Sequence, residues 1–273
     1  MAKKSKKPSL VEQSTRREFL RKQQEEQRKV QARNRRIVIS VALVLAVVVI
    51  GVFAAVFWAQ AQRGAGGNVV PPNANTDRSG IVVNPTLAAA AAHKVVVYLD
   101  YQCPGCAELE KTYGTQLELA ASSGTISLEY RAVAFLDPSL RNDASTRAAV
   151  AAACADTVGV YAAYHDQVFT NQPQREGDGY TSEQLRNVFP AAVGVTGENL
   201  TKFQQCYDSR ATQQFVQGVT DAAFQAGITG TPQVHFDGQA IDPTTLPTLL
   251  ASLTTPSATP TSSPAGTPTP TNS

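Results

Sequence analysis

The sequence has few of the residues from which metal sites and imidazole-based catalytic sites are built: its 273 residues include only four cysteines and three histidines. None of the histidines has a serine or a metal-ligating residue at a spacing typical of catalysis, so we expect neither a catalytic histidine nor a metal site. His165 is expected on the surface of a helix or at an interface, and His235 on a strand. The sequence also lacks a repeat of solenoid period, which argues against a repeat architecture.

Charge is missing from one long run, residues 37–58, which is almost entirely apolar. About 20 such residues cross the hydrocarbon core of a membrane as a helix. The preceding residues 1–36 carry 13 lysines and arginines against 4 acidic residues, so the positive-inside rule places them in the cytoplasm. We therefore predict a single-pass protein of the cell membrane whose remaining chain is extracytoplasmic. The basic segment has one aromatic residue, Phe19, so nucleic-acid binding is not expected.

A cleaved signal peptide is the alternative, because Ala59 and Ala61 offer a small-x-small cleavage site. The basic flank and the apolar run are both long for a signal peptide, which favours an uncleaved anchor. Residues 59–80 are rich in glycine, asparagine and proline and are predicted to form a flexible linker. Residues 254–273 are a threonine, proline and serine tract, predicted to be a disordered tail with O-glycosylation as a further possibility.

Two of the cysteines form a Cys-x-x-Cys motif, Cys103-Pro104-Gly105-Cys106, between an apolar run and a helical stretch. First-turn amides of a helix lack partners and carry the positive end of the helix dipole, so Cys103 is predicted to be a stabilised thiolate and the nucleophile. Cys106, one turn later and less exposed, is predicted to resolve a mixed disulfide. Pro104 suits a first helical turn because it has no N–H to leave unpaired.

A structural disulfide and half of a zinc site are the alternatives for this motif. A four-sulfur zinc site would need Cys154 and Cys206, which do not form a second close pair. In an exported protein with an even number of cysteines, these two are expected to form a structural disulfide with each other. Two buried free thiols remain the alternative.

Residues 81–253 are predicted to form one domain in which strands and helices alternate. Strands are expected where β-branched and aromatic residues lie between turn residues, and helices where apolar residues recur at helical spacing. The expected strands are 94–100, 126–135, 233–236 and 239–241, and the expected helices are 103–121, 144–158, 161–170, 182–188, 199–227 with breaks, and 243–253. This order is typical of an α/β fold.

The segments 100–106 and 230–234 together resemble the DsbA-like thiol:disulfide oxidoreductases, and more narrowly the membrane-anchored thioredoxin-like proteins of bacterial envelopes. The resemblance covers residues 81–253. It implies a thioredoxin-like fold with a helical domain inserted at about 139–227, because Cys103 and Pro232 are much farther apart in the sequence than in plain thioredoxin.

By position, the resemblance makes Cys103 the nucleophile, Cys106 the resolving cysteine, and Pro232 a cis-proline preceded by Thr231. A cis bond turns the Thr231 backbone toward the sulfurs, where it can pair with a substrate strand. Only about 5–6% of X–Pro bonds in folded proteins are cis, so a trans proline at the start of a strand is the alternative. Glu110 matches an acidic position of the family's active-site surround.

Two departures from the family bear on proton transfer and potential. The family's buried acid, six residues before the first cysteine, is replaced by Val97. Asp100 lies nearer the motif and could serve instead, although an Asp that caps the next turn is equally compatible. The dipeptide Pro104-Gly105 replaces the Pro-His of the strongly oxidising members, so we predict a milder oxidant.

The resemblance implies an enzyme without a cofactor that exchanges disulfides with exported cysteine-containing proteins. A disulfide donor is favoured by the predicted compartment and by the family, and it would need reoxidation by a quinone-linked membrane partner. A reductase or isomerase is the next alternative, although no dimerisation domain typical of isomerases is visible. A binding or chaperone module that uses the fold without turnover is the third.

Overall fold

The computed structural model describes residues 39, 44–54 and 67–254. The chain divides into two compact units, Met1–Gln62 and Arg63–Ser273. In the first unit residues 44–54 are helical. Across the described ranges, no helix is both long enough and apolar enough to cross a membrane.

Several predictions from composition concern residues outside these ranges. They are the basic segment 1–36, most of the membrane helix 37–58, the alternative cleavage site after Ala61, and the tail from residue 255. These stay predictions.

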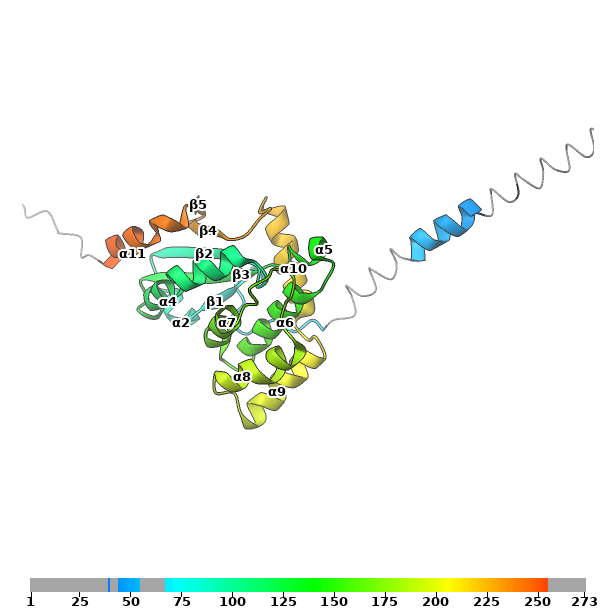
Figure 1. The fold of residues 1–273 in the computed structure, drawn as a ribbon. Coiled ribbons are helices and arrows are strands. Elements are labelled where there is room, and N and C mark those ends of the chain that lie inside the picture. The colour runs from blue at the N-terminus through cyan, green and yellow to red at the C-terminus, as the bar shows by residue number, and fades with distance from the viewer. Residues whose placement is uncertain (1–38, 40–43, 55–66, 255–273) are drawn as a thin grey trace, which may run out of the picture. The chain divides into compact units, whose positions relative to one another are not determined.

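The second unit contains a five-stranded sheet in the order β1-β3-β2-β4-β5 (Figure 1). Strands β2 and β3 are parallel, and the other neighbouring pairs are antiparallel. At the centre of the sheet, Val97 of β2 lies opposite both Tyr130 of β3 and Val234 of β4. The strands are β1 (Ile81–Val83), β2 (His93–Leu99), β3 (Ile126–Ala132), β4 (Gln233–Phe236) and β5 (Gln239–Ile241).

The central strand β2 follows from its sequence, because its last five residues are apolar or aromatic and all are buried. A strand covered on both faces carries such a continuous apolar run. The β4–β5 hairpin closes through Asp237 and Gly238, whose φ angles are 47° and 83°. Two consecutive left-handed residues are what a type I′ turn requires, and Asp-Gly is one of its preferred pairs.

The helices fall into three groups along the chain. A short helix α2 (Pro85–Ala88) precedes β2, and a crossover of α3 (Pro104–Leu109), the π-helical turn η1 (Glu110–Gly114) and α4 (Thr115–Ser122) joins β2 to β3. The insertion between β3 and β4 contains α5 (Asp137–Leu140), α6 (Ala144–Asp156), α7 (Tyr161–Thr170), η2 (Gln184–Val188), α8 (Phe189–Ala192), α9 (Gly197–Asp208) and α10 (Gln213–Gln225). The 3-10 turn η3 (Pro243–Thr245) and α11 (Leu246–Thr254) follow the hairpin.

Helix α6 is the central helix of the insertion and packs against α7, α9 and α10 (Figure 1). Eleven of its 13 residues are buried. Most of them are alanines, whose small side chains allow neighbouring helices to approach on all sides, and a helix that is apolar all round is buried. The predicted combination of a thioredoxin-like α/β fold and an inserted helical region is therefore what the second unit contains.

The active-site helix differs from the continuous helix 103–121 that periodicity predicted, because η1 interrupts it. A π-helical turn accommodates one extra residue and rotates the side chains that follow it. At η1, Glu110 turns inward and Gly114 packs against it: a Cβ on Gly114 would lie 2.7 Å from the Glu110 Oε2. Glycine therefore makes room for the carboxylate.

Residues 67–80, which composition placed in a flexible linker, form an ordered strap along the second unit. The Gly67 and Val69 amides donate to the carbonyls of Arg210 and Ala211 at 3.0 and 2.8 Å. Asn73 donates through its backbone N and its Nδ2 to the two oxygens of the Asp156 carboxylate, both at 2.8 Å. The prediction was wrong for these residues because linker-like composition carries no information about distant hydrogen-bond partners.

Candidate active site

Cys103 and Cys106 lie at the start of α3, immediately beyond the end of β2. Cys103 is the N-cap residue and Pro104 is in the first turn. The Cys103 carbonyl accepts the N–H groups of Cys106 and Ala107 at 3.1 and 3.2 Å, which begins the helix. Both cysteines are free thiols. Cys103 is 8% exposed and Cys106 is fully buried, so a substrate sulfur can approach Cys103 more readily.

The two thiols have opposite pKa shifts. The pKa of Cys103 is lowered to about 6, first by a hydrogen bond from Cys106 and then by Thr231 and the backbone amides of Cys106 and Gly105, while burial opposes the shift. Burial, followed by interaction with Cys103, raises the pKa of Cys106 well above its ordinary value. At neutral pH one sulfur is a thiolate and the other a thiol that donates to it.

The Thr231–Pro232 peptide bond is cis. The carbonyl oxygen of Thr231 lies 3.5 Å from the Cys103 Sγ and accepts its hydrogen when the thiol is protonated. In the same loop, the Pro232 Cδ would lie 3.2 Å from a Cβ placed on Gly105. The proline loop therefore packs closely against the Cys-x-x-Cys motif, as the resemblance implied.

Asp100 is fully buried at the end of β2. Its carboxylate accepts the backbone N–H of Gln102 and of Leu136 and the hydroxyl of Ser145, at 2.9, 3.0 and 2.6 Å. Burial raises its pKa to about 6 despite these donors. Its own N–H points to the Cys106 Sγ at 3.4 Å. Asp100 thus caps the active-site turn and is also a buried acid next to the resolving thiol.

Glu110 belongs to the π-helical turn of the active-site helix, and its side chain lies in a cluster of aromatic rings. The Tyr130 hydroxyl donates to Glu110 Oε2 at 3.2 Å, and the His165 Nε2 lies 3.5 Å from the same oxygen. The His165 ring stacks on Tyr130 with centroids 4.1 Å apart, and its Nδ1 is 3.0 Å from the Tyr101 hydroxyl. His165 was expected on the surface of a helix or at an interface; it is not on the surface but fully buried, where α7 packs against the active-site helix.

Sequence reasoning did not find Gln172, which connects the insertion to the active-site turn. Its Nε2 donates to the carbonyls of Tyr101 and Cys103 at 2.9 and 3.0 Å. The Tyr180 hydroxyl donates to the same Tyr101 carbonyl at 3.0 Å. Only the tertiary structure reveals this contact, because a glutamine 69 residues after Cys103 has no distinguishing local pattern.

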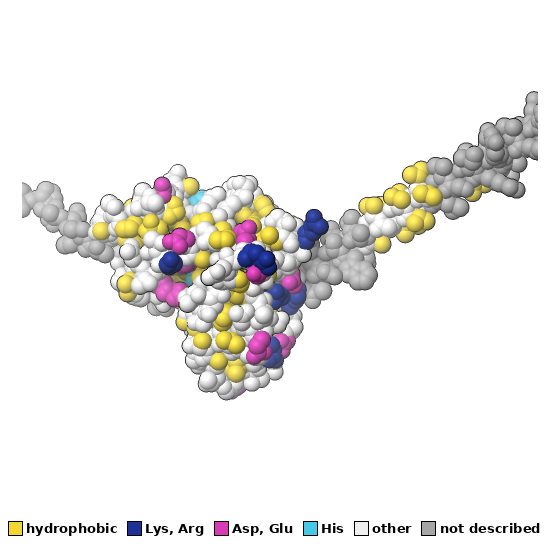
Figure 2. Space-filling view, in the orientation of Figure 1, with side chains coloured by type: hydrophobic (Ala, Val, Ile, Leu, Met, Phe, Trp, Pro, Cys, Tyr) yellow, Lys and Arg dark blue, Asp and Glu magenta, His cyan; other side chains and the backbone are white. Residues whose placement is uncertain are grey.

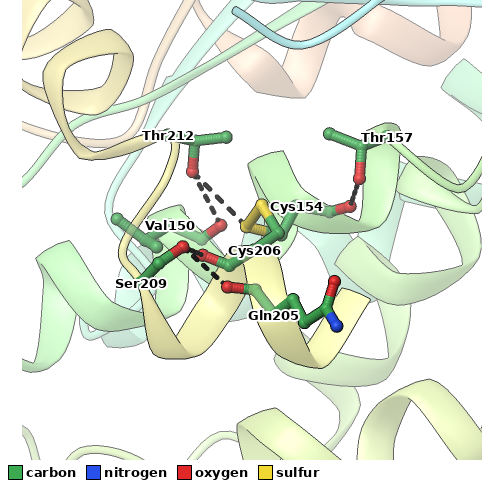
Figure 3. Close-up of a disulfide and its surroundings, with 7 residues drawn as sticks. All are labelled: Val150, Cys154, Thr157, Gln205, Cys206, Ser209 and Thr212. Atoms are coloured by element: carbon green, nitrogen blue, oxygen red, sulfur yellow. Dashed lines mark hydrogen bonds between the residues drawn. A yellow bond between two sulfur atoms is a disulfide. The ribbon is translucent and has the colours of Figure 1, made fainter. Parts of the chain in front are cut away.

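Cys154 of α6 and Cys206 of α9 form a disulfide (Figure 3). Thr212, at the start of α10, donates to the Val150 carbonyl at 3.1 Å and lies 3.7 Å from the Cys154 sulfur. The bond therefore joins helices of the insertion and leaves Cys103 and Cys106 free to react. Across the described part of the chain, no three His, Cys, Asp or Glu side chains gather in a way that could hold a metal ion.

Comparison with known proteins places this geometry in a family. The thioredoxin family model matches residues 88–254, more than half of the chain. The chain belongs to the thioredoxin family. A search of curated proteins finds no match.

Among solved structures, the chain is similar to MdbA, a thiol-disulfide oxidoreductase from Corynebacterium diphtheriae, with 22% identity and a TM-score of 0.55 over 70% of this chain and 98% of that one. It is similar to oxidised DsbA from Mycobacterium tuberculosis, with 21% identity and a TM-score of 0.53 over 64% and 92%. MdbA from Actinomyces oris matches with 23% identity and a TM-score of 0.54 over 68% and 92%. The fold of this thioredoxin family member is therefore that of the DsbA-type proteins.

Proposed function

We propose that the domain after residue 66 is a protein-disulfide oxidoreductase that donates its Cys103–Cys106 disulfide to cysteine pairs of exported proteins. The observation that carries this proposal is the pair of sulfurs with opposite pKa shifts, of which Cys103 Sγ lies 3.5 Å from the Thr231 carbonyl oxygen. The matching fold of proteins named as thiol-disulfide oxidoreductases supports it.

The disulfide passes from the protein to the substrate in two exchange steps. A substrate thiolate attacks the Cys103 sulfur of the oxidised pair, forming a mixed disulfide and releasing the Cys106 thiolate, which takes up a proton. The second substrate thiolate attacks the substrate sulfur of the mixed disulfide and releases the Cys103 thiolate. The substrate loses two electrons and the Cys103–Cys106 pair gains them.

The thiolate of Cys103 favours this direction, because a leaving group with a low pKa departs faster and stabilises the reduced enzyme. The edge of the proline loop at Thr231 is placed to hold a substrate strand by backbone hydrogen bonds.

The proposal includes the cellular setting predicted from sequence. The charge-free run 37–58 behind a basic flank supports a membrane anchor with the domain outside the cytoplasm. A donor that is reduced in each cycle requires an oxidant, for which we propose a quinone-linked membrane protein.

The test is the redox equilibrium of the full-length chain, purified in a neutral detergent, against glutathione. A reduction potential above about −200 mV supports the donor role, whereas a value near about −270 mV assigns a reductant. Cys106→Ser should trap a mixed disulfide when its Cys103 thiolate attacks a disulfide-bonded peptide, and Cys103→Ser should form no such adduct. A chain whose Cys103–Cys106 pair does not cycle reversibly would instead be a binding module.

A further inference from the structure

A hollow of about 440 Å³ lies against the active-site helix. Its lining includes Pro104 of the Cys-x-x-Cys motif, Glu108 and Glu110 farther along the same helical segment, and Asp166 and Phe169 of α7. Because Pro104 directly follows Cys103, the hollow begins beside the predicted nucleophile. A polypeptide joined to Cys103 by a mixed disulfide therefore has the hollow within its reach.

The hollow is acidic. Three of its lining residues are the acids Glu108, Glu110 and Asp166, and its lining contains one basic residue, Lys111. The Lys111 Nζ lies 3.7 Å from a carboxylate oxygen of Glu108, so this cation is already paired. Figure 2 shows acidic side chains on either side of a basic group on the α4 side of the second unit.

Burial and mutual repulsion disfavour the charged forms of two acids near the hollow, Asp166 in its lining and Glu118 of α4. Burial, followed by repulsion from Asp166, raises the pKa of Glu118 to about 7, and burial raises the pKa of Asp166. The ionisable group that faces them from α7 is His165, which is buried among aromatic rings. An added cation in the hollow would relieve the repulsion among these carboxylates.

Glu110 supplies an independent indication of a ligand. Its side chain is only 5% exposed, yet it lines the hollow. Tyr130 donates to its Oε2, but its Oε1 has no hydrogen-bond partner. A buried carboxylate oxygen without a donor is unfavourable, so a cation that binds at Glu110 would supply a missing N–H donor.

We propose that the hollow binds a lysine or arginine side chain of the substrate polypeptide, so that thiols near a basic residue are preferred substrates. This inference rests on the proposed function. Along α3 and η1, Glu110 lies six residues beyond Pro104, about 9 Å at the helical rise. An extended chain covers this distance in about three residues. The preferred basic residue therefore stands about three positions from the reacting cysteine.

The test measures kcat/KM for oxidation of dithiol peptides by the full-length oxidised chain. Three peptides differ only in the residue that stands three positions before and three positions after the reacting cysteine. This residue is lysine in the first peptide, the uncharged isostere norleucine in the second and glutamate in the third. We expect the lysine peptide to react about fivefold faster than the norleucine peptide, and the glutamate peptide to be slowest. The preference should shrink as salt screens the charges.

The variant Glu108→Gln/Asp166→Asn should bring the lysine-to-norleucine ratio close to one. The control is Glu198→Gln, which removes a carboxylate from α9 that is paired with Lys202 and does not line the hollow; it should keep the ratio. Equal rates for the lysine and norleucine peptides would refute the proposal that the hollow binds a basic side chain. An undiminished preference for lysine in the double variant would refute it as well.

The same peptides separate this inference from the proposed function. Reduction of the oxidised peptides in place of oxidation refutes the donor role, but the lysine preference is still measurable because both directions pass through one mixed disulfide. Oxidation of all peptides at equal rates refutes only the inference that the hollow binds a basic side chain, and leaves the donor role intact. Absence of exchange in either direction refutes both.

Discussion

The lowered pKa of Cys103 predicts how the reduced protein responds to pH. With a pKa of about 6, about 91% of the thiol is ionised at pH 7 and about 9% at pH 5, against about 3% at pH 7 for an ordinary cysteine. The rate of alkylation by iodoacetamide should therefore fall about tenfold from pH 7 to pH 5, with a midpoint near 6. Mass spectrometry of the alkylated Cys103 peptide gives this rate directly.

The structure also identifies which group causes the shift, since the largest contribution comes from the Cys106 side chain. Cys106→Ala removes this donor and should move the Cys103 midpoint upward, toward the ordinary value. Cys106→Ser keeps a hydroxyl donor and should give an intermediate midpoint. A midpoint above about 8 in the unsubstituted protein, or equal midpoints in all three proteins, would refute the reasoning.

The same ionisation affects folding and redox equilibria with a definite sign. A thiol whose pKa is lower in the folded state adds stability that is fully present above the unfolded pKa and is lost as pH falls through the folded one. The Tm of the reduced protein, relative to the oxidised protein, should thus rise from pH 5 to pH 8. At pH 7 the ionisation favours the reduced pair by about elevenfold, which makes the disulfide more oxidising by about 30 mV.

Three other substitutions test separate parts of the structure. Cys154→Ala opens a loop with a sequence separation of 52 and should lower the free energy of unfolding by about 4 kcal/mol in a denaturant titration; an unchanged midpoint would contradict the pairing. Gln172→Met keeps the side-chain length but removes one donor from the Cys103 carbonyl, which keeps the N–H groups of Cys106 and Ala107, so we expect a loss of about 0.5–1.5 kcal/mol together with a lower reduction potential; a stability loss at constant potential would mean a purely structural contact. Gly105→Val places a branched Cβ 3.2 Å from the Pro232 Cδ, so peptide oxidation should slow about tenfold; unchanged kinetics would show that the proline loop yields freely.

The regular elements followed closely from local sequence. The helix 161–170 and the strands 233–236 and 239–241 were predicted with the bounds observed, because apolar periodicity and the Asp-Gly turn are signals carried by adjacent residues. The short strand β1 (Ile81–Val83) was not predicted. Three residues give too little alternation to recognise, and β1 is defined by its pairing with β3.

In the active site, too, only the features that depend on adjacent residues could be predicted from the sequence. The motif at residues 103–106 is local, so its chemistry could be predicted from residue types and spacing. The burial of His165 could not, because a histidine among tyrosines suits a wet surface as well as an aromatic core. The contact of Gln172 with the Cys103 carbonyl spans 69 residues and follows from how the insertion packs.

The sequence by itself determined the two redox sulfurs, the order of the longer strands and helices, and the contrast between a basic, apolar N-terminal region and the rest of the chain. These features depend on neighbours in the chain, where propensity, capping and charge act. The tertiary structure alone decided which acids are buried under the sulfurs, which glutamine holds the nucleophile's carbonyl, and that Glu110 faces a hollow with one oxygen unpaired. These depend on desolvation and on hydrogen bonds between residues distant in sequence, whose energies exist only once the elements have packed.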